Sequence, residues 1–487
     1  MRLCFAGCVL LSFGLLLGDS PVHAVEFDLL SVGDVNNPAD HDFRFGRFGT
    51  VRYEYDVPSN EVTIDQYVEF LNAVAKSDPH QLFDPKMQSS RSGIISRSGS
   101  DGDYSYEPFE HYGNKPVGFI SYWDAARFAN WMHNGQPTGP QNDQTTEDGA
   151  YDLGGVTYPE NESVHRKPGA KWFLPSENEW YKAAHFDPRT EAQGGPPGDD
   201  FYWSYGTMSD TTPGKIETNE VGDVINPGPN VANYDFAAVW GGRFGNPATA
   251  GSAGSKSYYG VFDAAGSMWE WNESIIRRHE ISSEFTFRGN RGASWDDPAR
   301  LLPASMQGFG GVELCGTRFL CFTQGNGFRL ATIQGRDAAD FDSDGVHDVD
   351  DIDLLAAEIR SRENSVAMDI NLDGKVDSAD HRHLVLDLVG VQFGDSNLDG
   401  SFNSTDFVKV FQYGEYEDSA TDNSTWRTGD WNGDGDFDSR DFVIALQNSI
   451  YESTAIGQVP EPTGIGLAVA GLLWIASSGR VRVRSFS

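Results

Sequence analysis

Four twelve-residue segments in the last third of the chain carry oxygen-bearing side chains at one common spacing. Asp or Asn occupies positions 1, 3, 5 and 12 of each segment, and glycine occupies position 6. The glycine permits a sharp turn that points alternate side chains inward, and hard oxygen ligands suit Ca²⁺. The spacing predicts four calcium loops, called loops 1 to 4 below, at residues 340–351, 369–380, 395–406 and 430–441. The predicted ligands are Asp340, Asp342, Asp344, Asp351, Asp369, Asn371, Asp373, Asp380, Asp395, Asn397, Asp399, Asp406, Asp430, Asn432, Asp434 and Asp441.

The charge of this region allows another interpretation. Residues 336–452 contain 28 acidic and 8 basic side chains, and a dense acidic block is usually a solvated, disordered segment. The acids here recur in register, however, and an apolar run follows each loop. We therefore favour calcium binding over a merely solvated linker.

A loop followed by one exiting helix, with Asp at position 12, resembles the dockerin-type calcium repeat, here present as two pairs. The resemblance implies a small all-α, EF-hand-like region at residues 336–452 and a cohesin-like partner. Dockerin recognition in that family uses positions 10 and 11, which are Ser404 and Thr405 in loop 3. The other three loops carry different residues at these positions.

Residues 260–330 contain a second series of motifs. The series begins GVFDAAGSMWEWNES, continues RGNRGASWDDPARLL and closes on GNGFRL. In this order the motifs resemble the core of the formylglycine-generating enzyme family, also called the sulfatase-modifying factor family. The resemblance implies an α+β, C-type-lectin-like fold with little regular secondary structure for residues 25–335.

The chemistry of that family depends on two cysteines, the second and seventh residues after the aromatic residue that here is Trp295. Their thiolates hold Cu(I), which activates oxygen to convert a substrate cysteine to formylglycine. Soft sulfur ligands suit Cu(I), but Asp297 and Leu302 occupy the two positions here. A carboxylate and an alkyl group cannot build that centre, so we expect no copper cofactor and no catalytic residues at the family positions.

The resemblance also implies calcium within this domain. The ligands carried over are the side chains of Asp263 and Glu270 and the backbone carbonyls of Gly266 and Met268, with Asn233 matching part of a second calcium site. All are hard oxygen donors. The alternative is that Glu270 pairs with a buried arginine such as Arg329.

Three capping boxes predict where helices of this domain begin. They start at Thr63, Ser121 and Ser176, and apolar residues follow each at helical spacing. The stretches between them, such as residues 90–106 and 136–160, are rich in glycine and polar residues and are predicted as loops. Metal binding is one physical way to hold loops of this length.

Both ends of the chain carry signals for export and sorting. Arg2, an apolar run at residues 9–17 and small residues at 22–24 predict a signal peptide at residues 1–24. At residues 453–487, the Pro-Glu-Pro at 460–462, an apolar segment and three arginines resemble the PEP-CTERM signal of Gram-negative bacteria, which implies an exosortase-type sorting enzyme. The alternative is an ordinary transmembrane anchor. In either case we expect the protein at the cell surface or outside the cell.

Two cysteines remain after the signal peptide, Cys315 and Cys321. In an exported protein, two cysteines this close more often form a local disulfide than a metal site. A displaced copper-binding or catalytic pair is the alternative.

Three functions remain open after nucleic-acid binding is set aside because the net charge is −36. The first, which we predict, is a surface protein whose sulfatase-modifying-factor-like domain binds a peptide or glycan and is carried on calcium repeats. The second is a formylglycine-generating copper oxidoreductase that uses Cys315 and Cys321. The third is a component of a polysaccharide-degrading complex, held by its dockerin-type repeats.

Overall fold

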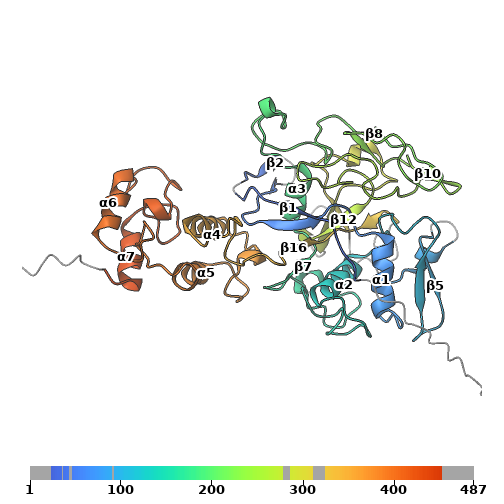
Figure 1. Ribbon diagram of the computed structural model, residues 1–487, viewed down its shortest axis with the longest axis horizontal. Helices are drawn as coiled ribbons and strands as arrows, with labels where there is room; N and C mark the ends of the chain where they lie inside the picture. Colours follow the sequence, from blue (N-terminus) through green and yellow to red (C-terminus); the bar gives the residue numbers. More distant parts are fainter. Residues whose placement is uncertain are drawn as a thin grey trace, which may run out of the picture. The chain divides into compact units, whose positions relative to one another are not determined.

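The computed structural model describes residues 24–35, 37–42, 46–89, 93–277, 286–310 and 324–451. The chain divides into two compact units: the first comprises Met1–Asp337 with Phe341–Ser343, and the second comprises Ala338–Asp340 with Asp344–Ser487. Figure 1 shows many short strands in the first unit and only helices and loops in the second. The predicted α+β fold with little regular secondary structure is confirmed, because most strands of the first unit have only two to four residues.

In the described part of the first unit, three α-helices begin at the predicted capping boxes. In each, the hydroxyl of Thr63, Ser121 or Ser176 accepts a backbone hydrogen bond from the residue three positions later, whose side chain accepts one in return. This reciprocal arrangement satisfies amide groups that the first helical turn leaves unpaired. The helices are α1 (Ile64–Val74), α2 (Tyr122–His133) and α3 (Glu177–His185).

Among the described residues, most of the longer strands lie in two four-stranded sheets. One sheet has the order β1-β4-β16-β7, with every pairing antiparallel. The other has the order β14-β13-β12-β15, in which β12 and β15 run parallel. The pairs β2-β3, β5-β6, β8-β9 and β10-β11 form small separate ladders. The strands are β1 (Leu29–Val32), β2 (Asp40–Asp42), β3 (Gly46–Phe48), β4 (Tyr55–Pro58), β5 (Ile95–Ser98), β6 (Ser105–Pro108), β7 (Trp172–Phe173), β8 (Gly214–Lys215), β9 (Val231–Ala232), β10 (Val239–Trp240), β11 (Arg243–Phe244), β12 (Trp269–Arg277), β13 (Thr286–Arg291), β14 (Gly308–Gly310), β15 (Asn326–Gly327) and β16 (Ala331–Thr332).

Aromatic packing joins the helices to the segment that carries the motifs. Phe70 of α1 meets Phe128 of α2 edge-on, with ring centroids 5.2 Å apart. Phe128 in turn meets Phe328, the phenylalanine of the GNGFRL motif, at 5.3 Å. Edge-to-face packing of this kind is the favoured geometry for aromatic pairs. The core therefore fixes the motif segment against α1 and α2.

The second unit contains α4 (Val349–Ser361), α5 (Ser378–His383), α6 (Ser404–Tyr413) and α7 (Ser439–Asn448). A π-helical turn, Leu384–Leu388, continues α5. Each helix begins at position 10 of a predicted calcium loop, so the predicted arrangement of loop and exiting helix is found four times. The helices begin here because the Asp or Asn side chain at position 9 of each loop caps the first turn.

None of the helices in the described ranges has both the length and the apolar character needed to cross a bilayer. The predicted signal peptide (apart from Ala24), Cys315, Cys321 and the whole predicted C-terminal sorting segment fall outside these ranges.

Candidate functional site

The turn after β13 carries the first of the two positions where the resemblance expects cysteine. Gly292 and Ala293 take left-handed backbone conformations, with φ of 98° and 65°, and the chain then doubles back beside the start of β12. Oδ2 of Asp297 accepts hydrogen bonds from Nε1 of Trp269 (2.6 Å), from the Ser294 amide (3.0 Å) and from the Ser294 hydroxyl (2.7 Å). The carboxylate of Asp297 thus ties the turn to β12.

The second position, Leu302, lies in an apolar cluster. Its side chain is only 2% exposed, and it packs with the residues Tyr205, Ala232, Tyr234 and Ala293. A side chain in the middle of such a cluster contributes by excluding water. Both positions therefore have packing or bracing roles that require no metal.

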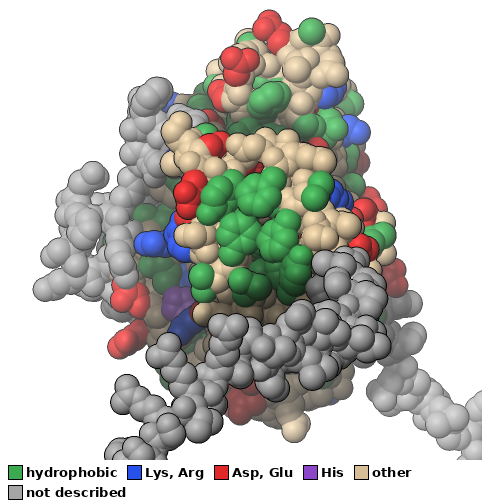
Figure 2. Space-filling model, turned by 90° about the vertical axis from the view of Figure 1, so that its left-hand side faces the viewer, with side chains coloured by type: hydrophobic (Ala, Val, Ile, Leu, Met, Phe, Trp, Pro, Cys, Tyr) green, Lys and Arg blue, Asp and Glu red, His purple; other side chains and the backbone are tan. Residues whose placement is uncertain are grey.

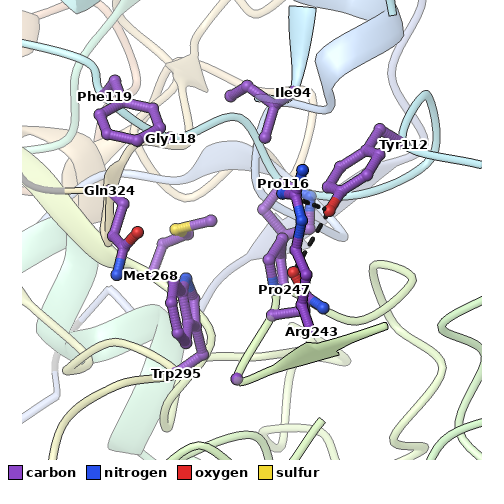
Figure 3. Close-up of a pocket in the computed structure, with 12 residues that line it drawn as sticks. Ile94, Tyr112, Pro116, Gly118, Phe119, Arg243, Pro247, Met268, Trp295 and Gln324 are labelled. Carbon is purple, nitrogen blue, oxygen red and sulfur yellow. Dashed lines mark hydrogen bonds between the residues drawn. The ribbon is translucent and has the colours of Figure 1, made fainter. Parts of the chain in front are cut away.

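A small pocket lies beside this turn (Figure 3). Trp295, Met268 and Gln324 line one side of it, and Tyr112 and Arg243 line the other. The cavity has a volume of about 30 Å³, which suits a single small group. Nη1 of Arg243 donates a hydrogen bond to the Tyr112 hydroxyl (2.9 Å), which donates to Oδ1 of Asn246 (3.2 Å). The polar wall is therefore held in place before any ligand arrives.

An exposed aromatic stack adjoins the pocket. Phe244 is 78% exposed and stacks on Phe236, with ring centroids 6.3 Å apart. Phe236 meets Trp295 edge-on at 6.0 Å. Exposed aromatic rings fixed by neighbouring rings are typical of surfaces that bind other molecules.

Glu270, one of the predicted calcium ligands, is fully buried on β12 and forms an ion pair. Its two carboxylate oxygens accept hydrogen bonds from Nε (2.5 Å) and Nη2 (2.7 Å) of Arg329, and Nε1 of Trp180 donates a third (2.7 Å). This two-pronged geometry is the strongest form of carboxylate recognition by arginine. The guanidinium supplies the positive charge that burial demands, and the calcium prediction for Glu270 remains a prediction.

Two further carboxylates lie close to this pair. Burial raises the pKa of Asp263 to about 6, although its Oδ2 accepts a hydrogen bond from the Gly251 amide (2.5 Å). Burial, with the negative charges of Asp263 and Glu270, raises the pKa of Glu61 well above its usual value. Both carboxylate oxygens of Glu61 are buried without a hydrogen-bond partner among the described residues. Arg329 thus faces three acids, and sequence reasoning did not identify Glu61 as one of them.

The other predicted ligands of the first unit meet around Gly266. Gly266 has φ of 81°, and a Cβ there would lie 2.3 Å from the carbonyl oxygen of Asn233, so only glycine fits. Asn233 donates through Nδ2 to the Asn246 carbonyl (2.9 Å), whereas its Oδ1 is buried with no partner in the described part of the chain. The carbonyl of Met268 faces Gly292. These contacts do not test the predicted calcium at Asp263, Gly266, Met268 and Asn233, which remains a prediction.

The four predicted calcium loops share one hydrogen-bond pattern. In each loop, the position-1 carboxylate accepts hydrogen bonds from the amides of positions 5 and 6, at 2.7 to 3.1 Å. Glycine at position 6 has φ between 88° and 93° in all four loops. This left-handed turn is the reason for glycine, because other residues rarely adopt it. The carboxylates at position 1 are Asp340, Asp369, Asp395 and Asp430.

The position-12 carboxylate joins each loop to its helix. It accepts a hydrogen bond from the amide of position 9, at 2.8 or 2.9 Å, and so completes a capping box. Sequence analysis selected position 12 as a ligand but missed position 9 as the cap. The sequence signal that could have revealed this cap is Asp or Asn at position 9 together with Asp at position 12. The position-9 caps are Asp348, Asp377, Asn403 and Asp438.

Burial and mutual repulsion make these loops suited to a cation. Asp380, Asp395, Asp406 and Asp441 are 0% exposed. Burial and the negative charge of Asp441 raise the pKa of Asp430 to about 7, and burial raises the pKa of Asp441 to about 6. In loop 1, ligand atoms of Asp340, Asp342 and Asp351 all lie within 4.8 Å of one another. Buried carboxylates grouped in this way require a compensating charge, and the donor set of hard oxygens fits Ca²⁺.

Helices α6 and α7 present an apolar face (Figure 2), called the α6/α7 face below. Val408 and Phe411 of α6 are 59% and 51% exposed, and Val443 and Leu446 of α7 are 52% and 60% exposed. The residues occupy equivalent positions of loops 3 and 4 and their helices, because Val408 and Val443 both stand two residues after position 12. An exposed apolar patch of this kind is typical of a protein interaction surface.

Two known protein families match different parts of the chain. The family described as "Sulfatase-modifying factor enzyme 1-like domain" matches residues 34–331, and the family described as "Dockerin type I domain" matches residues 393–448, which include loops 3 and 4. No curated protein matches the chain.

The solved structures that are similar to this chain include three that share 14–17% identity with it. The crystal structure of CarF shares 17% identity, covering 63% of this chain and 98% of that one, with a TM-score of 0.35. Treponema denticola variable protein 1 shares 15% identity, covering 64% and 97%, with a TM-score of 0.34. PvdO from Pseudomonas aeruginosa shares 14% identity, covering 63% and 91%, with a TM-score of 0.28.

The family match extends over more than half of the chain and includes α1 to α3, the sheet of β12 to β15 and the turn after β13. The chain therefore belongs to the family of sulfatase-modifying factor enzyme 1-like proteins and carries a dockerin type I domain in its second unit.

Proposed function

We propose that the first unit is a binding module that does not generate formylglycine. One observation supports this: the two positions expected to hold copper thiolates are Asp297, held by Trp269 and Ser294, and Leu302, buried in an apolar cluster. The pocket beside Trp295 and the stack of Phe236 and Phe244 form the surface that we propose for a peptide or glycan ligand.

A copper assay tests this proposal directly. The full chain is reduced, loaded with Cu(I) and given oxygen with a peptide that carries the family's C-x-P-x-R substrate motif. Mass spectrometry should find the peptide cysteine unchanged. Conversion to the aldehyde that is lost in both Cys315→Ser and Cys321→Ser would instead make the protein an oxidoreductase with a displaced thiolate pair.

We further propose that loops 1 to 4 each bind one Ca²⁺ through positions 1, 3, 5 and 12. The ion would supply the positive charge that neutralises the buried carboxylates. The chain contributes the shape of the site, since the amides of positions 5, 6 and 9 already orient the carboxylates at positions 1 and 12. Calorimetric titration should detect four loop sites, and Asp441→Ala should remove one of them. An unchanged number of sites in Asp441→Ala would exclude loop 4.

With calcium bound, we propose that the α6/α7 face docks a cohesin-like partner and so attaches the first unit to a larger assembly. Apolar surface buried at an interface supplies most of the association free energy. Leu446→Asp should abolish capture of a purified cohesin domain in calcium, because it places a charge in the contact. Val156→Asp, at a valine 53% exposed in the first unit, is the matched control and should bind normally. Capture that survives Leu446→Asp would place the contact elsewhere.

Export and sorting complete the proposal. The predicted signal peptide would direct the chain out of the cytoplasm, and an exosortase-type enzyme would process the C-terminal segment. Mass spectrometry of the protein from the native cell should find an amino terminus at Val25 and a carboxyl terminus near residue 462. An intact C-terminal segment in membranes would favour an ordinary anchor.

A further inference from the structure

The two pairs of calcium loops share one packed core. Trp426, which is 0% exposed, connects the pairs through its two N–H groups. Its backbone amide donates to Oδ1 of Asp353 on α4 (2.8 Å), and its indole donates to the carbonyl of Asp395, position 1 of loop 3 (2.8 Å). The rings of His381 on α5 and Phe393 pack against the same indole. The helices of loops 1 and 2 are thus packed against the segment between loops 3 and 4.

Helix α4 also contacts loop 4 directly through Arg360. Nη1 of Arg360 donates a hydrogen bond to the carbonyl of Gly433 (3.1 Å) and lies 3.6 Å from Oδ2 of Asp430. Asp430 is position 1 of loop 4 and Gly433 is position 4. Nε of Arg360 lies 3.3 Å from Oδ1 of Asp422, so the guanidinium is held on two sides.

The residue at position 4 distinguishes loop 4 from the other three loops. All four loops have positive φ there: 56° at Ser343, 62° at Leu372, 54° at Leu398 and 79° at Gly433. Loops 1 to 3 accept a side chain in this conformation, so the turn itself does not demand glycine. At Gly433, however, a Cβ would lie 3.3 Å from Cβ of Ala356 on α4 and 3.6 Å from Nε2 of His381. A side chain at this position of loop 4 would therefore press against α4, whereas its contact with α5 would be an ordinary one.

We propose that α4 is an intramolecular support for loop 4, so that calcium binding at loop 1 and at loop 4 is coupled. The inference rests on the proposed calcium function of the loops. Asp351 is both the position-12 carboxylate of loop 1 and the capping-box residue of α4, so an ion in loop 1 fixes the start of this helix. The helix then holds Ala356 and Arg360 against loop 4. Two events that stabilise the same contact favour each other, and the coupling is reciprocal. Arg360 is a positioning residue in this arrangement.

The test follows calcium binding at loop 4 in the full chain by ¹⁹F NMR. The chain is labelled with 5-fluorotryptophan, and the resonance of Trp431, position 2 of loop 4, is assigned with Trp431→Phe. We expect Gly433→Leu, Arg360→Gln and Asp351→Asn each to raise the calcium concentration at the midpoint of this resonance about threefold to tenfold, the range for one lost hydrogen bond or packing contact. Gly433→Leu changes no charge, and leucine already occupies position 4 of loops 2 and 3. Its effect would therefore report packing against α4.

Arg362→Gln is the matched control. It removes the same charge two residues beyond Arg360, from an exposed side chain, and should leave the midpoint within about 1.5-fold because charges exposed to water are screened. Equal midpoints in the wild type and all three variants, with binding intact, would overturn the coupling alone. A tighter midpoint in Arg360→Gln would also overturn it, because Arg360 would then act by repelling the ion. Absence of any calcium response in the wild type would overturn the calcium function itself.

Discussion

The two units bury carboxylates to a similar degree but compensate them in different ways. In the first unit the counter-charge belongs to the chain, as in the ion pair of Glu270 with Arg329. Similar buried pairs are Arg127 with Glu147, Arg166 with Glu179, and Arg291 with Glu177. In the second unit, backbone amides orient the buried carboxylates at positions 1 and 12 but bring no full positive charge. The first unit therefore carries counter-charges of its own for these carboxylates, whereas in the second unit the Ca²⁺ that we propose would supply most of them.

Chelation of calcium should separate the two units most clearly. At a free concentration of ~100 times the dissociation constant, each ion stabilises the folded state by about 2.7 kcal/mol, so losing several ions exceeds what a small unit can tolerate. Differential scanning calorimetry with excess EGTA should show that the transition of the second unit is lost or strongly lowered. The transition of the first unit should stay in place. A comparable decrease in the first unit would show that it also relies on calcium, at the predicted ligands around Asp263.

Breaking a buried ion pair should strongly destabilise the first unit. Arg329→Met leaves Glu270 and Asp263 without their counter-charge, and such a loss lowers the free energy of unfolding by about 3–5 kcal/mol. Urea denaturation measures it. The control is Lys215→Met, which removes a pair with Asp235 whose two side chains are 46% and 50% exposed and should lower the free energy by at most about 1 kcal/mol. Equal decreases in the free energy of unfolding would mean that the buried ion pair of Arg329 contributes no more to stability than an exposed pair.

Asp124 is a buried carboxylate of the first unit that is stabilised by hydrogen bonds. It is 3% exposed and accepts hydrogen bonds from the Ser121 amide and hydroxyl. Burial raises its pKa from 3.8 to about 7. The folded chain therefore holds a proton that the unfolded chain releases, and this contribution to stability is lost as pH rises from about 4 to 7.

Asp124→Asn should remove that pH dependence. Compared with the wild type, the free energy of unfolding of the variant should fall by about 1–3 kcal/mol less between pH 4 and 7. Urea denaturation at a series of pH values measures the difference. Parallel curves for the two proteins would show that Asp124 is ionised in the folded state.

The helix caps of the second unit should give the smallest effect. Asn403→Ala removes the position-9 cap of α6, and such a loss lowers stability by about 1 kcal/mol. Thermal unfolding in saturating calcium should show a decrease of a few degrees, and Ser401→Ala, two residues away, should change little. A collapse of calcium binding in Asn403→Ala would mean that position 9 belongs to the ion site itself.

The parts of the structure that sequence reasoning predicted best are local. The capping boxes at Thr63, Ser121 and Ser176 were read correctly because both partners lie three residues apart. The loop-and-helix units were found for the same reason, since loop and helix start fall within twelve residues. The partner of Glu270 could not be decided, because Arg329 is 59 residues away and the sequence allowed either an arginine or an ion.

Contacts between residues that are distant in the sequence also explain why sequence reasoning missed two residues. No motif marks Glu61, which precedes the capping box at Thr63, yet folding buries it beside Asp263 and Arg329. No motif marks Arg360 either, which lies in the last turn of α4. Its partner, Gly433, is 73 residues further along the chain, and no periodicity or spacing connects the two.

The sequence by itself determined that this protein has an α+β unit of the sulfatase-modifying factor type without cysteine at the expected copper positions, followed by four loops with calcium-ligand spacing. Those conclusions depend on residue types at short, fixed intervals, which local backbone geometry requires. Only the tertiary structure decided that Arg329 neutralises Glu270, that Leu302 belongs to the core and that α4 rests on loop 4. Each of these depends on which surfaces meet when distant segments pack, because burial makes a charge or a cavity too unfavourable to leave uncompensated.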